Sequence, residues 1–149
     1  KIHDMVEHAQ SQGAQVLTGG KRLTGGDYDK GNYYAPTILT NVDNDMDIMK
    51  EEIFGPVAPI MKVDSFEQAM EYANASEYGL SAYVFTQNVK QLMALTRELD
   101  FGEIYVNRGS GESVQGFHKG YRNSGLGGED GKYGLEAYVK SKTMYVHYA

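Results

Sequence analysis

The chain has 149 residues, of which 41% are hydrophobic and 23% are charged, and its formal net charge is -6. This composition is typical of a folded globular protein and excludes a disordered or collagen-like chain, and no run of apolar residues reaches the ~18 that a membrane span needs. The acidic balance argues against nucleic acid and anionic membranes as partners, and the absence of cysteine excludes disulfides and a cysteine nucleophile among these residues.

The first third of the chain predicts a helix followed by short strands. Residues 2–9 carry apolar side chains at the spacing of one helix face. Strands are expected at 15–17 and 33–39. Because Pro36 lacks a backbone N–H for the ladder, the second strand is expected at a sheet edge or in an irregular conformation. The polar and acidic residues 41–47 predict a connection on the surface.

The middle of the chain predicts a succession of strand, helix, strand, helix and strand. The strands are expected at 57–63, 81–85 and 103–107, and the helices at 66–75 and after Asn88. Ser65 and Asn88 are each followed three residues later by a glutamine, which is the spacing of a helix N-terminal cap. Because the connections are short, the strands are expected to be parallel with right-handed crossovers. The predicted fold is therefore α/β, with an open, largely parallel sheet and flanking helices.

The glycine-rich segment 108–131 follows the predicted strand 103–107, at the edge where open α/β sheets bind their ligands. A connection of this length inside a domain is usually functional or disordered. One or two helical turns are expected at 133–139, and the alternating residues 143–148 predict a final strand that must pair with another strand. The four histidines lack the spacing of metal ligands, so no metal site is expected.

Four motifs resemble those of the aldehyde dehydrogenase superfamily, in order and in spacing. They are Glu-Ile-Phe-Gly-Pro at 52–56, Gly-Leu-Ser-Ala at 79–82, Gly-Glu-Ile-Tyr-Val-Asn at 102–107 and the segment from Gly116 to Glu129. The resemblance covers essentially the whole chain. It implies that residues 1–140 form the carboxyl-terminal part of a catalytic domain, and that 141–149 form an oligomerisation strand, as in a homodimer or homotetramer.

The resemblance also implies that other parts of the protein precede Lys1: an NAD-binding domain, a cysteine nucleophile, a general-base glutamate and an oxyanion-hole asparagine. A first helix without a capping residue and the missing initiator methionine agree with this expectation. The parent would be a cytoplasmic, NAD(P)-dependent enzyme that oxidises an aldehyde to a carboxylate through a thioester on that cysteine. The 149 residues alone are expected to be inactive.

Several site residues follow from the resemblance, position by position. Glu52 matches a glutamate whose carboxylate accepts hydrogen bonds from the nicotinamide ribose of NAD or NADP, and Phe54 matches an aromatic beside the nicotinamide. Phe117 matches an aromatic at the aldehyde entrance. Glu129 matches a carboxylate behind the active site that helps to move protons. Without the resemblance, Phe117 would be interpreted as a core residue and Glu129 as a charged residue at the start of a helix.

The chain departs from the general family pattern around His118. Gly-Phe-His-Lys at 116–119 stands where the family usually has Pro-Phe-Gly-Gly. Phe-His at this position resembles the lactaldehyde/glycolaldehyde dehydrogenase branch. Arg122 stands where lysine is usual. Together with Glu112, His118 would place polar groups at the mouth of the aldehyde tunnel, which suits a small-molecule substrate with a hydroxyl group. A surface histidine and glutamate on a loop is the plain interpretation. A semialdehyde or betaine-aldehyde branch, and a free-standing non-catalytic α/β assembly module, are the alternatives.

Overall fold

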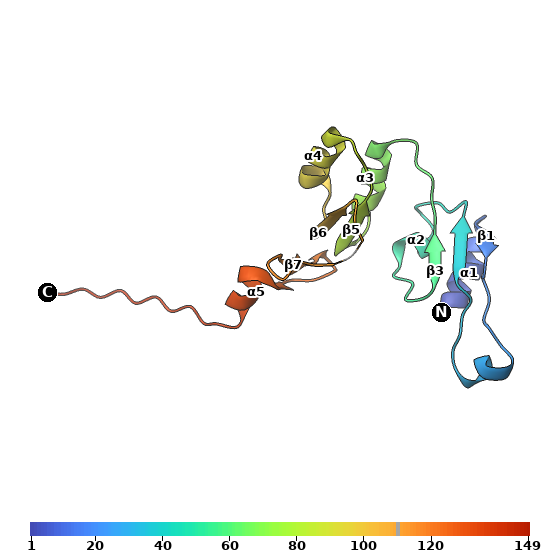
Figure 1. Cartoon of the computed structure of the whole chain (residues 1–149), viewed down its shortest axis with the longest axis horizontal. Helices are drawn as coiled ribbons and strands as arrows, with labels where there is room; N and C mark the ends of the chain where they lie inside the picture. The colour runs from blue at the N-terminus through green and yellow to red at the C-terminus, as the bar shows by residue number, and fades with distance from the viewer. Residues whose placement is uncertain (110) are drawn as a thin grey trace. The chain divides into compact units, whose positions relative to one another are not determined.

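The structure is a computed structural model that describes residues 1–109 and 111–149. The chain divides into two units, Lys1–Tyr72 and Ala73–Ala149, each with its own helices and strands (Figure 1). None of the helices in the described part of the chain is long and apolar enough to cross a membrane.

The first unit packs one helix against a three-stranded sheet. Its elements are α1 (Ile2–Ser11), β1 (Gln15–Thr18), the short 3-10 helix η1 (Gly26–Lys30), β2 (Thr37–Thr40), α2 (Asp47–Lys50) and β3 (Val57–Pro59). The strand order is β1-β2-β3, with β1 antiparallel and β3 parallel to β2. The helix face predicted within residues 2–9 is confirmed, because Val6 and Ala9 are buried in a core shared with Leu39. Apolar burial of this kind is the main contribution to stability in such a small unit.

Two expectations for this unit need correction. Pro36 does not place its strand at a sheet edge, because β2 is the central strand. The irregular alternative holds: Tyr34 makes only a single bridge to Arg22, and the ladder begins after Pro36, where its missing N–H is not needed. The first ladder donor is the Thr37 N–H, 2.8 Å from the Pro56 carbonyl oxygen. Residues 41–47 are not only a surface connection either. Their acidic side chains are exposed, but Val42 and Met46 alternate with them and are buried in the core.

The second unit is built around a parallel strand pair. The helix α3 (Phe66–Asn74) crosses the boundary between the two units and leads into β4 (Tyr78–Gly79), β5 (Ser81–Val84), α4 (Val89–Glu98) and β6 (Glu103–Val106). β5 and β6 are parallel and are joined through α4, as the short connections predicted. The helix caps are confirmed as well: Ser65 Oγ accepts from the Gln68 N–H at 3.1 Å, and Asn88 accepts from two amides of α4.

The glycine-rich segment forms short strands that sequence periodicity did not indicate. They are β7 (His118–Lys119), β8 (Tyr121–Arg122) and β9 (Gly128–Glu129), and the expected helical turns follow as α5 (Gly131–Ala137). β7 pairs with β9 and β8 pairs with β4, both antiparallel. The α/β class is confirmed, although β3 pairs with β2 in the first unit and not with β5 as the predicted succession implied.

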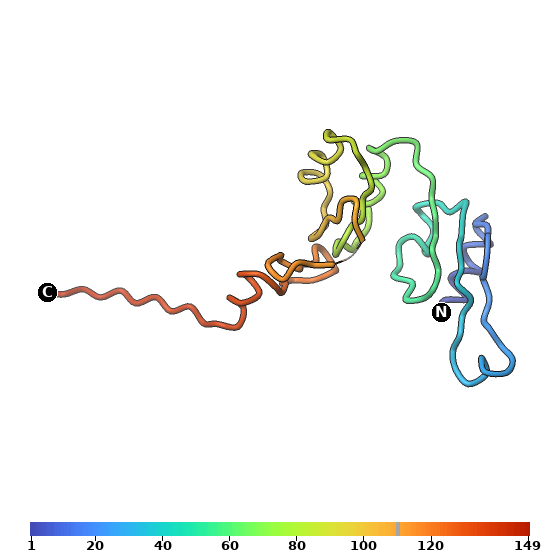
Figure 2. Tube along the Cα trace, viewed as in Figure 1, coloured from blue at the N-terminus to red at the C-terminus, as the bar shows by residue number. Residues whose placement is uncertain are grey.

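The last residues, 140–149, form neither helix nor strand and are exposed in the single chain. Figure 2 shows this segment as an extended trace. A strand requires a partner for its backbone donors and acceptors. The oligomerisation strand at 141–149 therefore stays a prediction about a second chain.

Candidate functional site

The two residues predicted to contact the cofactor lie in the loop between α2 and β3 of the first unit. Glu52 is exposed, and the Phe54 side chain is 83% exposed with a backbone φ of 52°. A positive φ is rare for an aromatic residue and is kept only where the surroundings impose it. The next residue, Gly55, lies against the Ile2 side chain, whose Cδ1 a β-carbon on Gly55 would meet.

This loop fits the ribose and nicotinamide of an NAD(P) cofactor in its chemistry. An ionised carboxylate can only accept hydrogen bonds, as the Glu52 side chain would from two ribose hydroxyls. The exposed ring of Phe54 offers an apolar face two residues away. Burial of that face by a planar group would remove a large exposed apolar surface from water.

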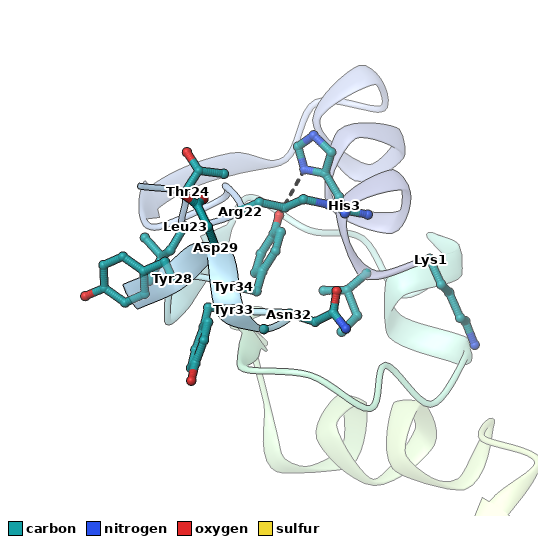
Figure 3. A pocket seen from close by; sticks show the side chains of 12 residues that line it. Lys1, His3, Arg22, Leu23, Thr24, Tyr28, Asp29, Asn32, Tyr33 and Tyr34 are labelled. Carbon is teal, nitrogen blue, oxygen red and sulfur yellow. Dashed lines mark hydrogen bonds between the residues drawn. The ribbon is translucent and has the colours of Figure 1, made fainter. Parts of the chain in front are cut away.

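A separate cavity of about 440 Å³ lies in the first unit beside η1 (Figure 3). Its wall includes His3, Arg22, Tyr28, Tyr33 and Tyr34, and His3 Nδ1 is 3.3 Å from the Tyr34 hydroxyl. Burial, followed by the nearby charge of Glu7, raises the pKa of Tyr34. None of the residues expected to touch substrate or cofactor is among those lining it.

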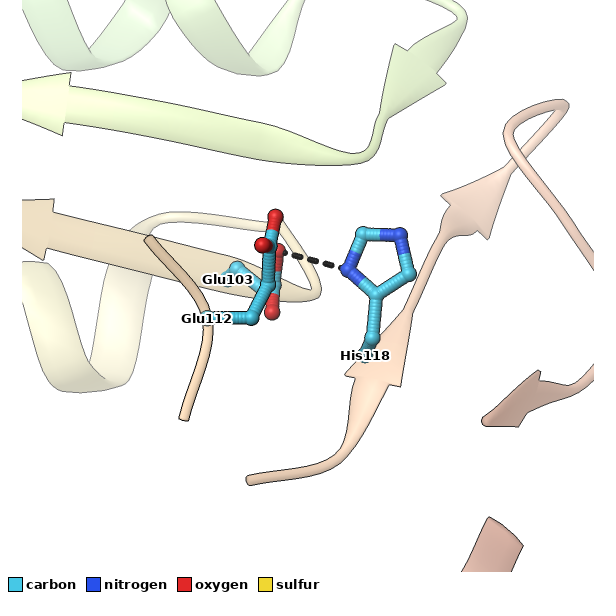
Figure 4. Close-up of side chains that lie close together, drawn as sticks. All are labelled: Glu103, Glu112 and His118. Carbon is cyan, nitrogen blue, oxygen red and sulfur yellow. Dashed lines mark hydrogen bonds and ion pairs between the residues drawn. The ribbon is translucent and has the colours of Figure 1, made fainter. Parts of the chain in front are cut away.

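The residues predicted to touch the substrate gather in the second unit, around His118. His118 begins β7, and its Nδ1 lies 2.9 Å from Oε2 of Glu103, the first residue of β6 (Figure 4). The Tyr105 hydroxyl donates to the same carboxylate oxygen at 3.0 Å. Burial and this hydrogen bond raise the pKa of Tyr105 to about 12.

Close backbone packing brings the two strands together. A β-carbon on Gly102 would overlap the backbone carbonyl of Lys119, so only glycine allows this approach. The Gly102 N–H donates to the Gly79 carbonyl at 3.0 Å. Because Glu103 follows Gly102 and His118 precedes Lys119, the contact places their side chains next to each other.

Two more carboxylates lie near the imidazole. Glu112 is exposed, and one of its oxygens lies within 4.8 Å of ligand atoms of both Glu103 and His118. Glu129 is directly opposite His118 in the β7–β9 ladder. The hydrogen bond to Glu103 raises the pKa of His118, against the effect of burial, and the surrounding carboxylates add to the rise.

The same three groups, Glu103, Glu112 and His118, form a donor set that could hold a cation, because each offers one ligand atom. From the spacing of the histidines, no metal site was expected. Spacing could not reveal this donor set, because its three residues come from separate segments of the chain. The 2.9 Å contact already uses Nδ1 of His118, which favours a hydrogen-bonded ion pair over ligation by that nitrogen.

The remaining expected residues flank His118. Phe117 is half-buried against Tyr133, with ring centroids 5.0 Å apart, and Glu129 is exposed. A hollow of about 360 Å³ is lined by residues that include His118 and Glu129. Sequence reasoning named Glu112, Phe117, His118 and Glu129, and the structure brings them together in one unit. It missed Glu103, whose only sequence signal is a charge at the start of an apolar strand.

Comparisons with known proteins show the family to which the chain is similar. A sequence model described as "Aldehyde dehydrogenase family" matches residues 1–144. The chain is 56% identical over 144 residues to 3,6-anhydro-alpha-L-galactose dehydrogenase of Vibrio sp. (strain EJY3), covering 97% of this chain and 30% of that protein. It is 44% identical over 146 residues to lactaldehyde dehydrogenase of Escherichia coli, covering 98% of this chain and 30% of that protein.

Solved structures give the same result. The structure of a 3,6-anhydro-L-galactose dehydrogenase superposes with a TM-score of 0.94 at 53% identity, over 98% of this chain and 31% of that one. The chain thus spans about 30% of the length of the curated relatives that it matches. On the family match, the high identity and the shared fold, the chain belongs to the aldehyde dehydrogenase family.

Proposed function

We propose that this chain works within a longer, NAD(P)-dependent aldehyde dehydrogenase, called the parent below, which oxidises a short hydroxyaldehyde such as lactaldehyde or glycolaldehyde to its carboxylate. The observation that carries the proposal is the cluster of Glu103, Glu112 and His118. The chain contains no cysteine, so the nucleophile and its base belong to other parts of the parent. The 149 residues by themselves are inactive in this account.

The cluster suits a substrate with a hydroxyl group near the aldehyde. A hydroxyl can donate to the Glu112 carboxylate and exchange a hydrogen bond with the His118 imidazole. An alkyl aldehyde of the same length would displace water from these groups without replacing its hydrogen bonds, and leaving a desolvated polar group unpaired is costly. Discrimination therefore arises at the cluster, through the groups that only a hydroxylated substrate satisfies.

The names of the relatives support the same class of substrate. Lactaldehyde and D-glyceraldehyde, which appear in the names of relatives 44% and 42% identical to this chain, both carry a hydroxyl beside the aldehyde carbon. So does 3,6-anhydro-L-galactose in its open form, and the relative named for it is 56% identical. The higher identity favours this sugar-derived aldehyde as a second candidate of the same chemical class.

The other branches are distinguished by charge. Succinate semialdehyde carries a carboxylate, which three glutamates, Glu103, Glu112 and Glu129, would repel around His118. Betaine aldehyde is a cation that these carboxylates would attract, so it belongs in the same assay. A non-catalytic assembly module would show no oxidation of any of them.

The cofactor is assigned to the exposed loop of the first unit. Glu52 would accept hydrogen bonds from the ribose hydroxyls, and Phe54 would limit where the nicotinamide lies. When bound, the cofactor supplies the hydride acceptor. The relatives include an aldehyde dehydrogenase solved as an NAD+ complex and one named for NADP+, so the proposal includes both cofactors. In the second unit, Phe117 would line the entrance and Glu129 would relay protons.

The test compares kcat/KM of the parent for a panel of aldehydes that includes one pair matched in size. Lactaldehyde and propanal differ by one hydroxyl, and succinate semialdehyde, betaine aldehyde and 3,6-anhydro-L-galactose complete the panel. We expect lactaldehyde or the anhydrosugar to exceed propanal by about tenfold or more, the ratio that about 1.4 kcal/mol of differential binding produces. Equal values for lactaldehyde and propanal, or a maximum with either charged aldehyde, would contradict the proposal.

A further inference from the structure

We infer that Glu103 is a positioning residue that fixes the imidazole of His118 with Nδ1–H directed into the protein and Nε2 directed to the substrate hydroxyl. The inference rests on the proposed function, because it concerns how the same site recognises a hydroxyaldehyde. It adds a residue that none of the four family-like motifs marks as functional.

The Glu103 carboxylate is held in place independently of His118. Glu103 opens β6, and its backbone N–H donates to the Leu80 carbonyl at 3.0 Å. Oε2 accepts a second hydrogen bond from the hydroxyl of Tyr105, whose ring stacks on Tyr83 at 4.9 Å between centroids. Only 15% of the Glu103 side chain is exposed. The carboxylate is therefore a fixed acceptor to which the imidazole of His118 adjusts.

The chemistry of the two groups determines where the ring proton lies. An ionised carboxylate accepts hydrogen bonds and cannot donate them, so the nitrogen 2.9 Å from Oε2 must carry a hydrogen. In the neutral imidazole this hydrogen occupies Nδ1 and leaves a lone pair on Nε2. In the imidazolium form Nε2–H is a donor. In both forms the orientation of Nε2 is the same.

The ring presents Nε2 away from Glu103. Figure 4 shows Nδ1 of His118 on the edge that faces the carboxylate and the second nitrogen on the opposite edge. His118 also lines the 360 Å³ hollow, and its side chain is 29% exposed, so a small molecule can reach the ring. Without Glu103, the imidazole would lose the partner that selects this tautomer and this rotamer.

The groups that face the imidazole also determine its charge. They are Glu103 from β6, Glu112 from the loop that follows, and Glu129 from β9. All three are acidic and favour the imidazolium, but only Glu103 makes a hydrogen bond to the ring in the described part of the chain. Removal of Glu112 or Glu129 would change the charge around the ring without releasing its orientation.

The kinetic test replaces Glu103 with its uncharged isostere in the parent. Glu103→Gln keeps the size of the side chain but removes its charge: the NH2 group can donate to Nδ1 and favour the opposite tautomer, and the carbonyl oxygen is a weaker acceptor for Nδ1–H than a carboxylate. We expect the lactaldehyde-to-propanal ratio of kcat/KM to fall by about tenfold or more, mainly through the KM for lactaldehyde, while the values for propanal stay nearly unchanged. The control is Glu98→Gln, the same change on an exposed residue at the end of α4, which should leave the ratio as it is.

The outcomes separate the two proposals. A wild-type ratio near one contradicts the proposed function, and with it the role of Nε2. A high wild-type ratio that Glu103→Gln leaves intact overturns the positioning role alone. An equal loss of activity toward both aldehydes also overturns it, because a general structural defect would act on both substrates.

A second measurement does not use the Glu103 variant. In the wild-type parent labelled with 15N-histidine, two-bond 1H–15N correlation spectra distinguish the neutral tautomers, and His118→Asn identifies the signal. Above the pH at which His118 loses its charge, we expect the Nδ1–H tautomer, which is the less common one for free histidine. A neutral Nε2–H tautomer would overturn the inference.

Discussion

Glu103 and His118 form a 2.9 Å contact between Oε2 and Nδ1, although they lie on strands that do not pair with each other. β6 pairs with β5, and β7 pairs with β9. The contact therefore links the parallel strand pair to the glycine-rich segment that follows it. Because Glu103 opens β6, the polar groups of the second unit lie at the amino end of the parallel strand pair, and not at the carboxyl end where the sequence placed the ligand edge.

Replacement of His118 by asparagine in the parent should lower kcat/KM for lactaldehyde by about tenfold or more, since one hydrogen bond to the hydroxyl is lost and Glu103 loses its partner. The value for propanal should change little. Steady-state kinetics with both aldehydes measures the effect. His8→Asn, on the exposed side of α1, is the matched control. Equal losses for both substrates would show that His118 does not recognise the hydroxyl.

The ion pair of His118 should make stability depend on pH in a defined direction. The folded state raises the pKa of His118 above its ordinary value of 6.5, mainly through the hydrogen bond to Glu103. The stabilisation is therefore fully present below pH 6.5 and is lost as pH rises through the folded-state value. The difference in thermal midpoint between wild type and Glu103→Gln should be larger at about pH 6 than at about pH 9. A difference that grows toward alkaline pH would contradict the assigned pair.

Gly102→Ala should destabilise the second unit by about 1–3 kcal/mol, because the new β-carbon would overlap the Lys119 carbonyl and neither backbone can move freely. It should also separate Glu103 from His118 and reduce selectivity for lactaldehyde. Gly109→Ala is the control, since no heavy atom lies within 4 Å of the β-carbon that it adds. Denaturant titration measures both variants, and an equal effect of the two would refute the packing argument.

Arg122→Lys should destabilise the chain by about 1–3 kcal/mol. The Arg122 guanidinium donates to the carbonyls of Asn74 at 2.8 Å and Asp100 at 2.6 Å, and also to that of Ser76. A lysine ammonium cannot reach all three from one position. Arg97→Lys, on an exposed face of α4, should be neutral in the same thermal unfolding experiment. Equal unfolding midpoints for the two variants would exclude this role of the guanidinium.

Glu52→Gln should raise the KM of the parent for its cofactor by about tenfold, because an ionised acceptor for the ribose hydroxyls becomes a neutral amide. The KM for the aldehyde should change less. Glu51→Gln alters the adjacent carboxylate, which lies 3.5 Å from the Lys1 amino group, and serves as the control. A variant with unchanged cofactor KM would remove Glu52 from the site.

The helices and the parallel strand pair were predictable because their signals are local. Ser65 and Asn88 cap their helices as their spacing indicated, and the apolar residues of α1 form one buried face. The sheet-edge position predicted from Pro36 was wrong, because the effect of a proline depends on whether it lies inside a strand or just before it. The sequence alone did not define where β2 begins.

The candidate site was only partly predictable for a related reason. His118 and Glu112 stood out as departures from a family pattern, but Glu103 acquires its role through a contact between strands that are distant in sequence. Propensity and periodicity contain no information on such a contact. The positive φ of Phe54 was equally hidden, because residue type and spacing at 52–56 do not mark it.

The most direct test of the central claim, that this chain acts within a longer dehydrogenase, is the intact mass of the protein in its source cells. Antibody capture through residues 143–149 followed by mass spectrometry gives this value. Since the chain spans 30% of its relatives, the account predicts a mass about three times the 16.5 kDa of these 149 residues. A mass of 16.5 kDa would contradict the claim and favour a binding or assembly role.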